Sequence, residues 1–447
     1  MKRGFSILLG GLLLAGVAMI VVPSMAADLP KNLIPIIENT TASGRFDVYH
    51  WWTTGGEKEA INSALNVFEE HYPNIEGVSN AIPGGAGGAM VMKVKVLIVA
   101  GHSPDTFQAH PSFEIHPYTD SDMLYSLDDI WKYDNIEARL LPGIADMCKV
   151  GDDYYAAPIG IHRANVIWYN KHMFSEYGIE PPQEPVTWEE FWALCDELQA
   201  KLPEGKYPLA LGDRKGWPGT QVFETIMMGT DPKIYEHFIN GVATEEEVGQ
   251  ILTKFKKFLA YVPPDHTARL WYEAAARVYA GDYAMYLNGG WVKGYFNSRG
   301  WVPGKDYGAF LAPGTSNDFG LVVDSFVVPR GSSNAEMGIR WAHMCTDPDL
   351  QLAFTSLKGS ISPYSDTPDS VYDPITLQFK KDLLNKDVLV YPSIAHGMAL
   401  PWSTLMTLHS LISDFTSRSN PDVARHARNI TQAVRESGIK EVWHFDF

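Results

Sequence analysis

The sequence predicts an α/β protein of two lobes, and three observations lead to this prediction. The chain has 447 residues, which is more than one hydrophobic core normally accommodates, so two lobes with a cleft between them are expected. Short strand patterns alternate with helical patterns from residue 46 onward, as in βαβ units. Three turn-rich segments divide the chain at positions where it could cross from one lobe to the other.

Residues 1–26 have the pattern of a secretory signal peptide. Lys2 and Arg3 precede an apolar run from Ile7 to Val22, and small residues follow before a cut after Ala26. The run is shorter than the roughly 18 to 20 residues that span a bilayer. We therefore expect export to the periplasm with cleavage of this segment.

Composition argues against several classes of protein. The formal net charge of −17 disfavours nucleic acid and anionic membrane surfaces as partners. Cys148, Cys195 and Cys345 lack metal-ligand spacing, and the 14 histidines are scattered without paired spacing. Gly-x-Ser-x-Gly and His-Glu-x-x-His motifs are absent from the sequence. We expect no metal site, no cofactor and no enzyme.

The first elements of the chain alternate between strand and helix. The segment FDVYHWW from Phe46 indicates a strand, and residues 57–72 carry apolar side chains at the three- and four-residue spacing of an amphipathic helix. The glycine-rich segment 83–88 predicts a turn, residues 90–100 a second helix and residues 105–110 a short strand. This order predicts a mostly parallel sheet in the first lobe.

The middle of the chain is predicted to be rich in helices. Thr187 with Glu190, and Thr244 with Glu247, have the spacing of capping boxes and each precede a stretch with helical periodicity. Cys195 lies among apolar neighbours in the first of these stretches, which favours a buried structural thiol.

Three segments are candidate lobe boundaries: the stretch near Pro158, the turn near Gly314, and the Pro/Ser/Asp-rich run from Ser362 to Pro374. Three crossings would form two discontinuous lobes joined at a hinge. The predicted division is an N-terminal lobe of residues 27–157 and 323–371, and a C-terminal lobe of residues 158–322 and 372–447.

Tryptophan is abundant, with 13 residues, and several indoles lie where strands or helices should begin or end. An aromatic face packs well on the C–H groups of a sugar ring. The candidates for this role are Trp51, Trp52, Trp271 and Trp291. If the first strand continues through Trp51 and Trp52, these neighbours point to opposite faces, so that one can be core while the other faces a ligand.

Polar residues near these indoles could bind the hydroxyl groups of a neutral polyol. The candidates are Glu57, Gln108, His110, Asp324, Lys358 and His396. The segment PGGAGG at 83–88 lacks the Gly-Lys-Ser/Thr ending of a phosphate-binding loop, which favours a turn that passes close to a ligand or another element. Glu57 and Asp324 could instead be the two carboxylates of a glycosidase, which sequence spacing alone leaves open.

Several motifs, in order and spacing, resemble the carbohydrate class of ABC-transporter solute-binding proteins. The resemblance covers almost the whole chain after the signal segment. This class is part of the superfamily of maltose-binding-like proteins, and the resemblance is strongest to its glucose-binding members. The motifs are WWTTGGE at 51–57, GGAGG at 84–88, SPDTFQAH at 103–110, APIGIHRANVIWYN at 157–170, RVYAGDYAMYLNGGW at 277–291, VDSFVVPRG at 323–331, LKGSIS at 357–362 and IAHGMA at 394–399.

This resemblance implies a type II-like periplasmic binding protein fold whose lobes close on a sugar. It also implies that the ten candidate residues contact the sugar. Trp51 and Trp52 would flank it, and Glu57, Asp324 and Lys358 would bond its hydroxyls. Gln108 and His110 would line the wall of the first lobe, and Trp271, Trp291 and His396 would face them from the second lobe. His162 and Asn165 match a family motif and are second-rank candidates for ligand contact or for holding the hinge. Gly290 stands where glucose-binding relatives have an acidic residue, which bears on the choice of sugar.

The predicted function is therefore a periplasmic, monomeric substrate-binding protein of an ABC sugar importer. Its ligand is predicted to be a monosaccharide, glucose or a similar hexose, and its membrane partner the permease. A ligand that contacts both lobes would bind the closed state best and so favour closure. The alternatives are an oligosaccharide or sugar acid as ligand, and a periplasmic glycoside hydrolase that uses Glu57 and Asp324.

Overall fold

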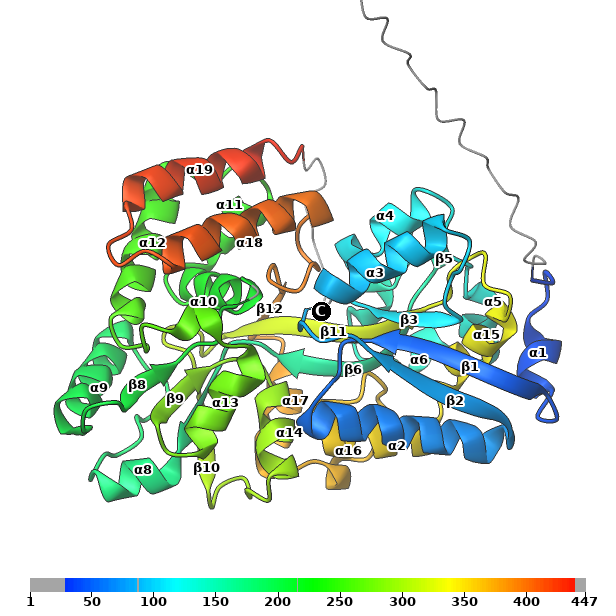
Figure 1. Ribbon diagram of the computed structural model, residues 1–447, viewed down its shortest axis with the longest axis horizontal. Coiled ribbons are helices and arrows are strands. Elements are labelled where there is room, and N and C mark those ends of the chain that lie inside the picture. Colours follow the sequence, from blue (N-terminus) through cyan, green and yellow to red (C-terminus); the bar gives the residue numbers. More distant parts are fainter. Residues whose placement is uncertain (1–28, 87, 215, 439–447) are drawn as a thin grey trace, which may run out of the picture.

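The computed structural model describes residues 29–86, 88–214 and 216–438 (Figure 1). The predicted signal peptide, residues 1–26, lies outside the described residues. Within the described ranges, no helix has the length and apolar character needed to cross a bilayer. The chain forms a mixed α/β fold of two lobes, as the sequence predicts.

The first lobe is built around a six-stranded sheet in the order β12-β11-β3-β1-β2, with β6 paired to β11, and this sheet extends through β6, β11 and β12 toward the second lobe. Its strands are β1 (Ser43–His50), β2 (Asn74–Ala81), β3 (Thr106–Ala109), β6 (Ala157–Arg163), β11 (Asp318–Val327) and β12 (Leu389–Pro392). Strand β1 is parallel to β2 and β3, whereas β11 is antiparallel to β3 and β6. The parallel part follows from the strand and helix alternation of the sequence.

Helices cover this sheet and enclose its hydrophobic core. The larger ones are α1 (Ile34–Glu38), α2 (Gly55–His71), α3 (Gly88–Val99), α5 (Asp128–Tyr133), α15 (Ala335–Met344) and α16 (Pro348–Lys358). The short elements are η1 (Ser112–Glu114), α4 (His116–Thr119), α6 (Ile136–Arg139), α7 (Ile144–Met147) and the hairpin β4 (Lys149–Val150) with β5 (Asp153–Tyr154). The apolar side of α2, including Ile61, Leu65 and Phe68, is buried in the core, which explains its helical periodicity.

The second lobe has a four-stranded sheet in the order β10-β7-β9-β8. Its strands are β7 (Val166–Asn170), β8 (Tyr207–Ala210), β9 (Tyr283–Leu287) and β10 (Tyr307–Leu311). The helices around it are α8 (Lys171–Glu176), α9 (Trp188–Lys201), α10 (Trp217–Met228), α11 (Pro232–Ile239), α12 (Glu245–Leu259), η2 (His266–Ala268), α13 (Trp271–Tyr279), α14 (Trp291–Ser298), α17 (Pro374–Leu383), α18 (Trp402–Thr416) and α19 (Val423–Arg435). The short η3 (Asp369–Val371) lies in the segment that leads from α16 to α17. Every residue of α10 is buried, so this helix runs through the centre of the lobe.

Strand β11 runs from one lobe into the other (Figure 1). Its first residues, from Asp318 to Leu321, pair with β12, whereas its last residues, from Ser325 to Val327, pair with β3. Strand β6 pairs with β11 from Leu321 to Phe326, so its pairing overlaps both of these regions. The two antiparallel strands therefore link the lobes directly.

A close backbone contact also joins the lobes beside these strands. A Cβ atom at Gly56 of α2 would lie 2.6 Å from the carbonyl oxygen of Gly294 in α14, and a Cβ at Gly294 would lie 2.5 Å from the carbonyl oxygen of Lys358 in α16. Real Cβ atoms do not approach other atoms so closely, so only glycine fits at both positions.

Local sequence signals agree with the observed elements to within a few residues. The strand expected from Phe46 is β1, and the helix expected over 57–72 is α2. Both predicted capping boxes are confirmed, with the Thr187 and Thr244 hydroxyls accepting from the backbone N–H groups of Glu190 and Glu247. Cys195 is buried, as predicted.

Candidate functional site

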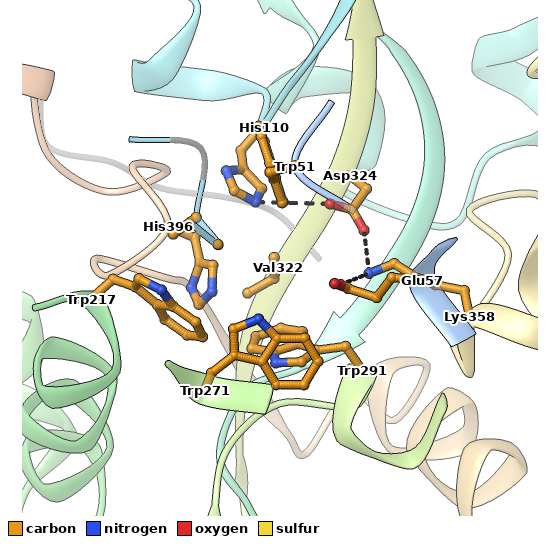
Figure 2. A pocket seen from close by; sticks show the side chains of 12 residues that line it. Trp51, Glu57, His110, Trp217, Trp271, Trp291, Val322, Asp324, Lys358 and His396 are labelled. Atoms are coloured by element: carbon orange, nitrogen blue, oxygen red, sulfur yellow. Dashed lines mark hydrogen bonds and ion pairs between the residues drawn. The ribbon is translucent and has the colours of Figure 1, made fainter. Parts of the chain in front are cut away.

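A cavity lies between the two lobes and takes its lining from both (Figure 2). Its empty space measures about 310 Å³, part of which is open to solvent. The carboxyl ends of β1 and β3, the glycine-rich turn and the start of α2 approach from one side, and the first turns of α10, α13 and α14 from the other. The lining residues are Trp51, Glu57, Gly85, Ala86, His110, Trp217, Trp271, Trp291, Val322, Asp324, Lys358 and His396.

Aromatic rings form most of the apolar wall. The His396 ring lies 5.1 Å from Trp291 and 5.3 Å from Trp217, measured between ring centroids. On the opposite side Trp51 lies 4.9 Å from the His110 ring. The four indoles of the wall are each at most 5% exposed, so they are almost entirely excluded from solvent in this structure.

A buried ion-pair cluster provides the polar wall. The ammonium group of Lys358 lies 2.7 Å from Glu57 Oε1 and 3.6 Å from Asp324 Oδ2. Burial raises the pKa of the Glu57 carboxyl, and the adjacent Lys358 opposes this shift. Burial would also raise the pKa of Asp324, but Lys358 and His162 outweigh it and hold this pKa below its usual range. Asp324 is therefore an ionised acceptor at neutral pH.

Hydrogen bonds fix the orientation of the polar groups. Gln108 donates from Nε2 to Asp324 Oδ1 at 3.0 Å and accepts from the backbone N–H of Trp51 at 3.2 Å. His110 Nδ1 lies 2.7 Å from Glu114 Oε2, which leaves its Nε2 on the side of Asp324, 3.9 Å from Oδ1. These contacts hold the acceptors and donors of the wall in place before any ligand arrives.

Of the ten residues predicted from the sequence, eight line the cavity. The other two, Trp52 and Gln108, lie behind its wall. The Trp52 ring is in the core, 5.0 Å from the ring of Phe354, and the Lys358 ammonium lies 5.0 Å from its centroid. Trp52 thus supports Lys358 from behind, and Gln108 supports Asp324.

Trp217 lines the cavity but was not predicted from the sequence. Its indole N–H donates to the carbonyl oxygen of Gly84 at 3.2 Å, and a Cβ at Gly85 would lie 2.8 Å from the same nitrogen. The glycine-rich turn of the first lobe therefore packs directly on an indole of the second. Gly216 and Pro218 mark a helix start around Trp217, but this local signal does not reveal that the start faces the cleft.

The second-rank candidates lie next to the cavity. His162 Nε2 is 3.4 Å from Asp324 Oδ2, and burial together with Lys358 lowers the pKa of His162 to about 4. Asn165 accepts from the backbone N–H of Gly320 at 2.9 Å and so ties β6 to β11. A Cβ at Gly290 would lie 3.1 Å from His162 Nδ1, so a side chain at this position would meet His162 first.

In the described part of the chain, no group of three or more His, Cys, Asp or Glu side chains is arranged to bind a metal ion. The arrangement instead suits a neutral ligand with apolar faces and many hydroxyls, because flat rings and charged hydrogen-bonding groups line the same small space.

Fold and cavity together define a two-lobed carbohydrate-binding protein of an ABC transporter. Residues 51–351 match the family described as bacterial extracellular solute-binding protein, and the chain belongs to this family. It is 40% identical over 407 residues to an uncharacterized ABC transporter extracellular-binding protein of Pyrococcus horikoshii, covering 89% of this chain and 90% of the relative.

One further relative agrees with this assignment, and one solved structure shares the fold. A probable sugar-binding periplasmic protein of Brucella melitensis is 26% identical over 395 residues, covering 87% of this chain and 91% of that protein. The solved structure of the bacterial solute receptor AcbH, described as having an exclusive preference for β-D-galactopyranose, superposes with a TM-score of 0.74 at 17% identity. That superposition covers 88% of this chain and 98% of the receptor.

Proposed function

We propose that this protein captures a monosaccharide, glucose or a similar hexose, for an ABC importer. The observation that carries the proposal is the small cavity between the lobes, with indoles on its faces and the Glu57, Lys358 and Asp324 cluster at its edge. Buried indoles from both lobes bound this space on two sides, which suits a single sugar ring better than an oligosaccharide.

The proposed ligand contacts are divided between the lobes. Trp51, Glu57, His110, Asp324 and Lys358 bind from the first lobe, and Trp217, Trp271, Trp291 and His396 from the second. A ligand held by both groups stabilises the closed state selectively. The identity of the sugar depends on which hydroxyls meet the charged cluster.

We further propose that the lobes are residues 27–157 with 323–371, and residues 158–322 with 372–447. The hinge consists of β6, β11 and the segment that follows α16. Strands that pass between lobes can absorb a closing rotation in a few backbone angles. The working protein is proposed to be a monomer in the periplasm, released from residues 1–26, whose closed form is recognised by the permease.

Hydrolysis is disfavoured by the placement of Lys358. A glycosidase needs one protonated carboxyl and one carboxylate free to act on the sugar. Here a single ammonium group lies 2.7 Å from Glu57 and 3.6 Å from Asp324, so it engages both carboxylates. We propose that they bind hydroxyls and do not transfer protons.

Calorimetric titration of unfolded and refolded protein tests the function. Refolding removes any sugar that survives purification. Glucose, galactose, mannose, xylose, maltose and glucuronate are titrated separately, with product analysis. Saturable binding of one hexose without turnover is expected, and binding of maltose or glucuronate alone, or release of products, would contradict the proposal.

A matched pair of variants tests the site. Asp324→Asn removes the charge that faces the cavity, whereas Asp318→Asn alters another buried carboxyl on β11 outside it. A hydrogen bond to a charged group is worth about 1.5–3 kcal/mol, so D324N is expected to weaken binding by roughly 10- to 100-fold. D318N should bind as the parent does, and equal affinities in both variants would refute the assignment.

A further inference from the structure

A chain of buried hydrogen bonds extends from the cavity into the core of the second lobe. Ser393, directly after β12, donates from Oγ to Glu224 Oε1 at 2.7 Å, and its Oγ lies 2.8 Å from Nδ1 of His396. The other oxygen of Glu224 accepts from the backbone N–H of Ala395 at 2.9 Å. Glu224, Ser393 and His396 are each at most 4% exposed, so no bulk water replaces these bonds.

The numbers of donors and acceptors in this series of hydrogen bonds fix the direction of each bond. A serine hydroxyl has one proton, and an ionised carboxylate only accepts. When Glu224 is ionised, the Ser393 proton goes to Glu224, so Ser393 Oγ must accept from Nδ1–H of His396. A neutral imidazole with its proton on Nδ1 has a bare Nε2, which is a hydrogen-bond acceptor. No partner for Nε2 is recorded among the described residues, and the His396 ring points into the cavity (Figure 2).

Protonation of Glu224 reverses the chain. Its oxygen toward Ala395 is occupied by the backbone donor, so the added proton lies on the oxygen toward Ser393. The Nδ1 proton of His396 passes to Ser393 Oγ, the Ser393 proton passes to Glu224, and one proton is taken up from the cavity at His396 Nε2. Ser393 then accepts a hydrogen bond from Glu224 and donates one to His396 Nδ1, so the face of His396 in the cavity changes from acceptor to donor.

We propose that Glu224 and Ser393 are positioning residues that set whether His396 offers an acceptor or a donor to the bound sugar. The inference rests on the proposed function, because it concerns a residue of the same cavity. Neither Glu224 nor Ser393 touches the cavity, and both act through His396.

Near neutral pH, Glu224 is the group whose protonation decides the direction of these hydrogen bonds. Burial raises the pKa of Glu224 to about 7, although Ser393 and backbone N–H groups oppose the shift. The charged or titratable groups that face the chain are His110 and Asp324 from the first lobe, His162 from β6, His409 from α18 and Tyr235 from α11. Burial lowers the pKa of His162 and of His409 to about 4 and that of His396 well below its usual value. These three imidazoles therefore stay neutral while Glu224 titrates.

Nitrogen NMR of histidine-labelled, sugar-free protein tests the inference from pH 5.5 to 8.5. The Nδ1–H form of His396 is expected to dominate at high pH and the Nε2–H form at low pH, with a midpoint near the pKa of about 7. In Glu224→Gln the amide oxygen faces Ala395 and the NH2 group faces Ser393, so the Nε2–H form should persist at every pH. Asp213→Asn, another buried carboxyl of the same lobe, is the control and should titrate as the parent does.

Two results would overturn the inference. One is an identical His396 tautomer in the parent and E224Q across the range, and the other is a pH step that persists in E224Q, which would assign the step to a group other than Glu224. Sugar affinity gives the second readout: in the parent it should change by about tenfold across the same midpoint, and in Ser393→Ala and E224Q it should be flat. The NMR experiment uses sugar-free protein, so it tests this inference without depending on sugar binding. Failure of the proposed function would appear only in the sugar titrations.

Discussion

Lys358 and Glu57 form a buried ion pair of 2.7 Å although 301 positions separate them in the sequence. Glu57 lies in the first turn of α2, and Lys358 is the last residue of α16, so the pair forms where these two helices meet. The contact places a positive charge beside two carboxylates at the edge of the cavity. Four predictions about this ion pair, the cavity wall and the core of the second lobe can be tested.

Lys358→Met is expected to destabilise the protein and to weaken sugar binding. Removal of one partner leaves Glu57 and Asp324 buried without a counter-charge, which typically costs about 3–5 kcal/mol. Urea unfolding followed by circular dichroism measures the loss. The double variant E57Q/K358M should recover part of it, with a coupling of about 0.5–3 kcal/mol, and strictly additive losses would show that the pair is not coupled.

Gly85→Ala is expected to weaken sugar binding by impeding closure. Its Cβ would lie 2.8 Å from the indole nitrogen of Trp217 across the lobe boundary. Gly178→Ala is the matched control, because the φ angles, +66° and +59°, impose similar backbone strain and nothing lies within 4 Å of a Cβ at Gly178. Calorimetry should show roughly tenfold weaker binding for G85A than for G178A, and equal affinities would argue against a closure contact.

Trp217→Phe is expected to lower affinity because it removes both part of the wall and the N–H bond to Gly84. Aromatic contacts are worth about 0.5–1.5 kcal/mol beyond their buried area, so the loss should be up to roughly tenfold. Trp192→Phe makes the same change in the core of the second lobe, 5.2 Å from Trp188 and away from the cavity. If both variants bind like the parent, Trp217 is not a ligand contact.

The stability of the protein is expected to fall as pH rises from about 4 to about 6, in part through Asp213. Burial raises the pKa of this carboxyl from 3.8 to about 6, although Thr416 and Gly219 donate to it. The folded state therefore holds a proton that the unfolded state releases, so the free energy of unfolding decreases through this window by on the order of 3 kcal/mol. Asp213→Asn should show a correspondingly flatter pH profile in urea unfolding, and an unchanged slope would contradict the shifted pKa.

Local signals in the sequence were sufficient for most of the secondary structure. The Thr187 and Thr244 capping boxes mark their helices because each depends on residues three positions apart. The alternation of side chains along an extended chain also predicts that Trp51 and Trp52 point apart, and the structure has Trp51 at the cavity and Trp52 in the core. The resemblance to a family placed both indoles at the sugar, because a motif does not record which way each side chain points.

Contacts between distant segments could not be predicted in this way. Trp217 approaches Gly84 across 133 positions, and Ser393 meets Glu224 across 169. Helix α10, which carries both Trp217 and Glu224, is buried on all sides. Its polar residues Thr220, Gln221, Glu224 and Thr225 share one face, but because that face is buried the pattern does not indicate which side lies toward the cleft. Only the packing of the second lobe decides that its first turn contacts the cavity and that Glu224 reaches the His396 segment.

The cavity wall brings Trp51 from the first lobe together with Trp217, Trp271 and Trp291 from the second, all nearly excluded from solvent. Indole fluorescence shifts in wavelength and intensity when water reaches the ring. In the proposed closing motion, these rings become hydrated together when the lobes part and are shielded again when a sugar is enclosed. Under the proposed function the protein therefore contains its own optical reporter of occupancy, and each capture and release can be followed in real time without a label.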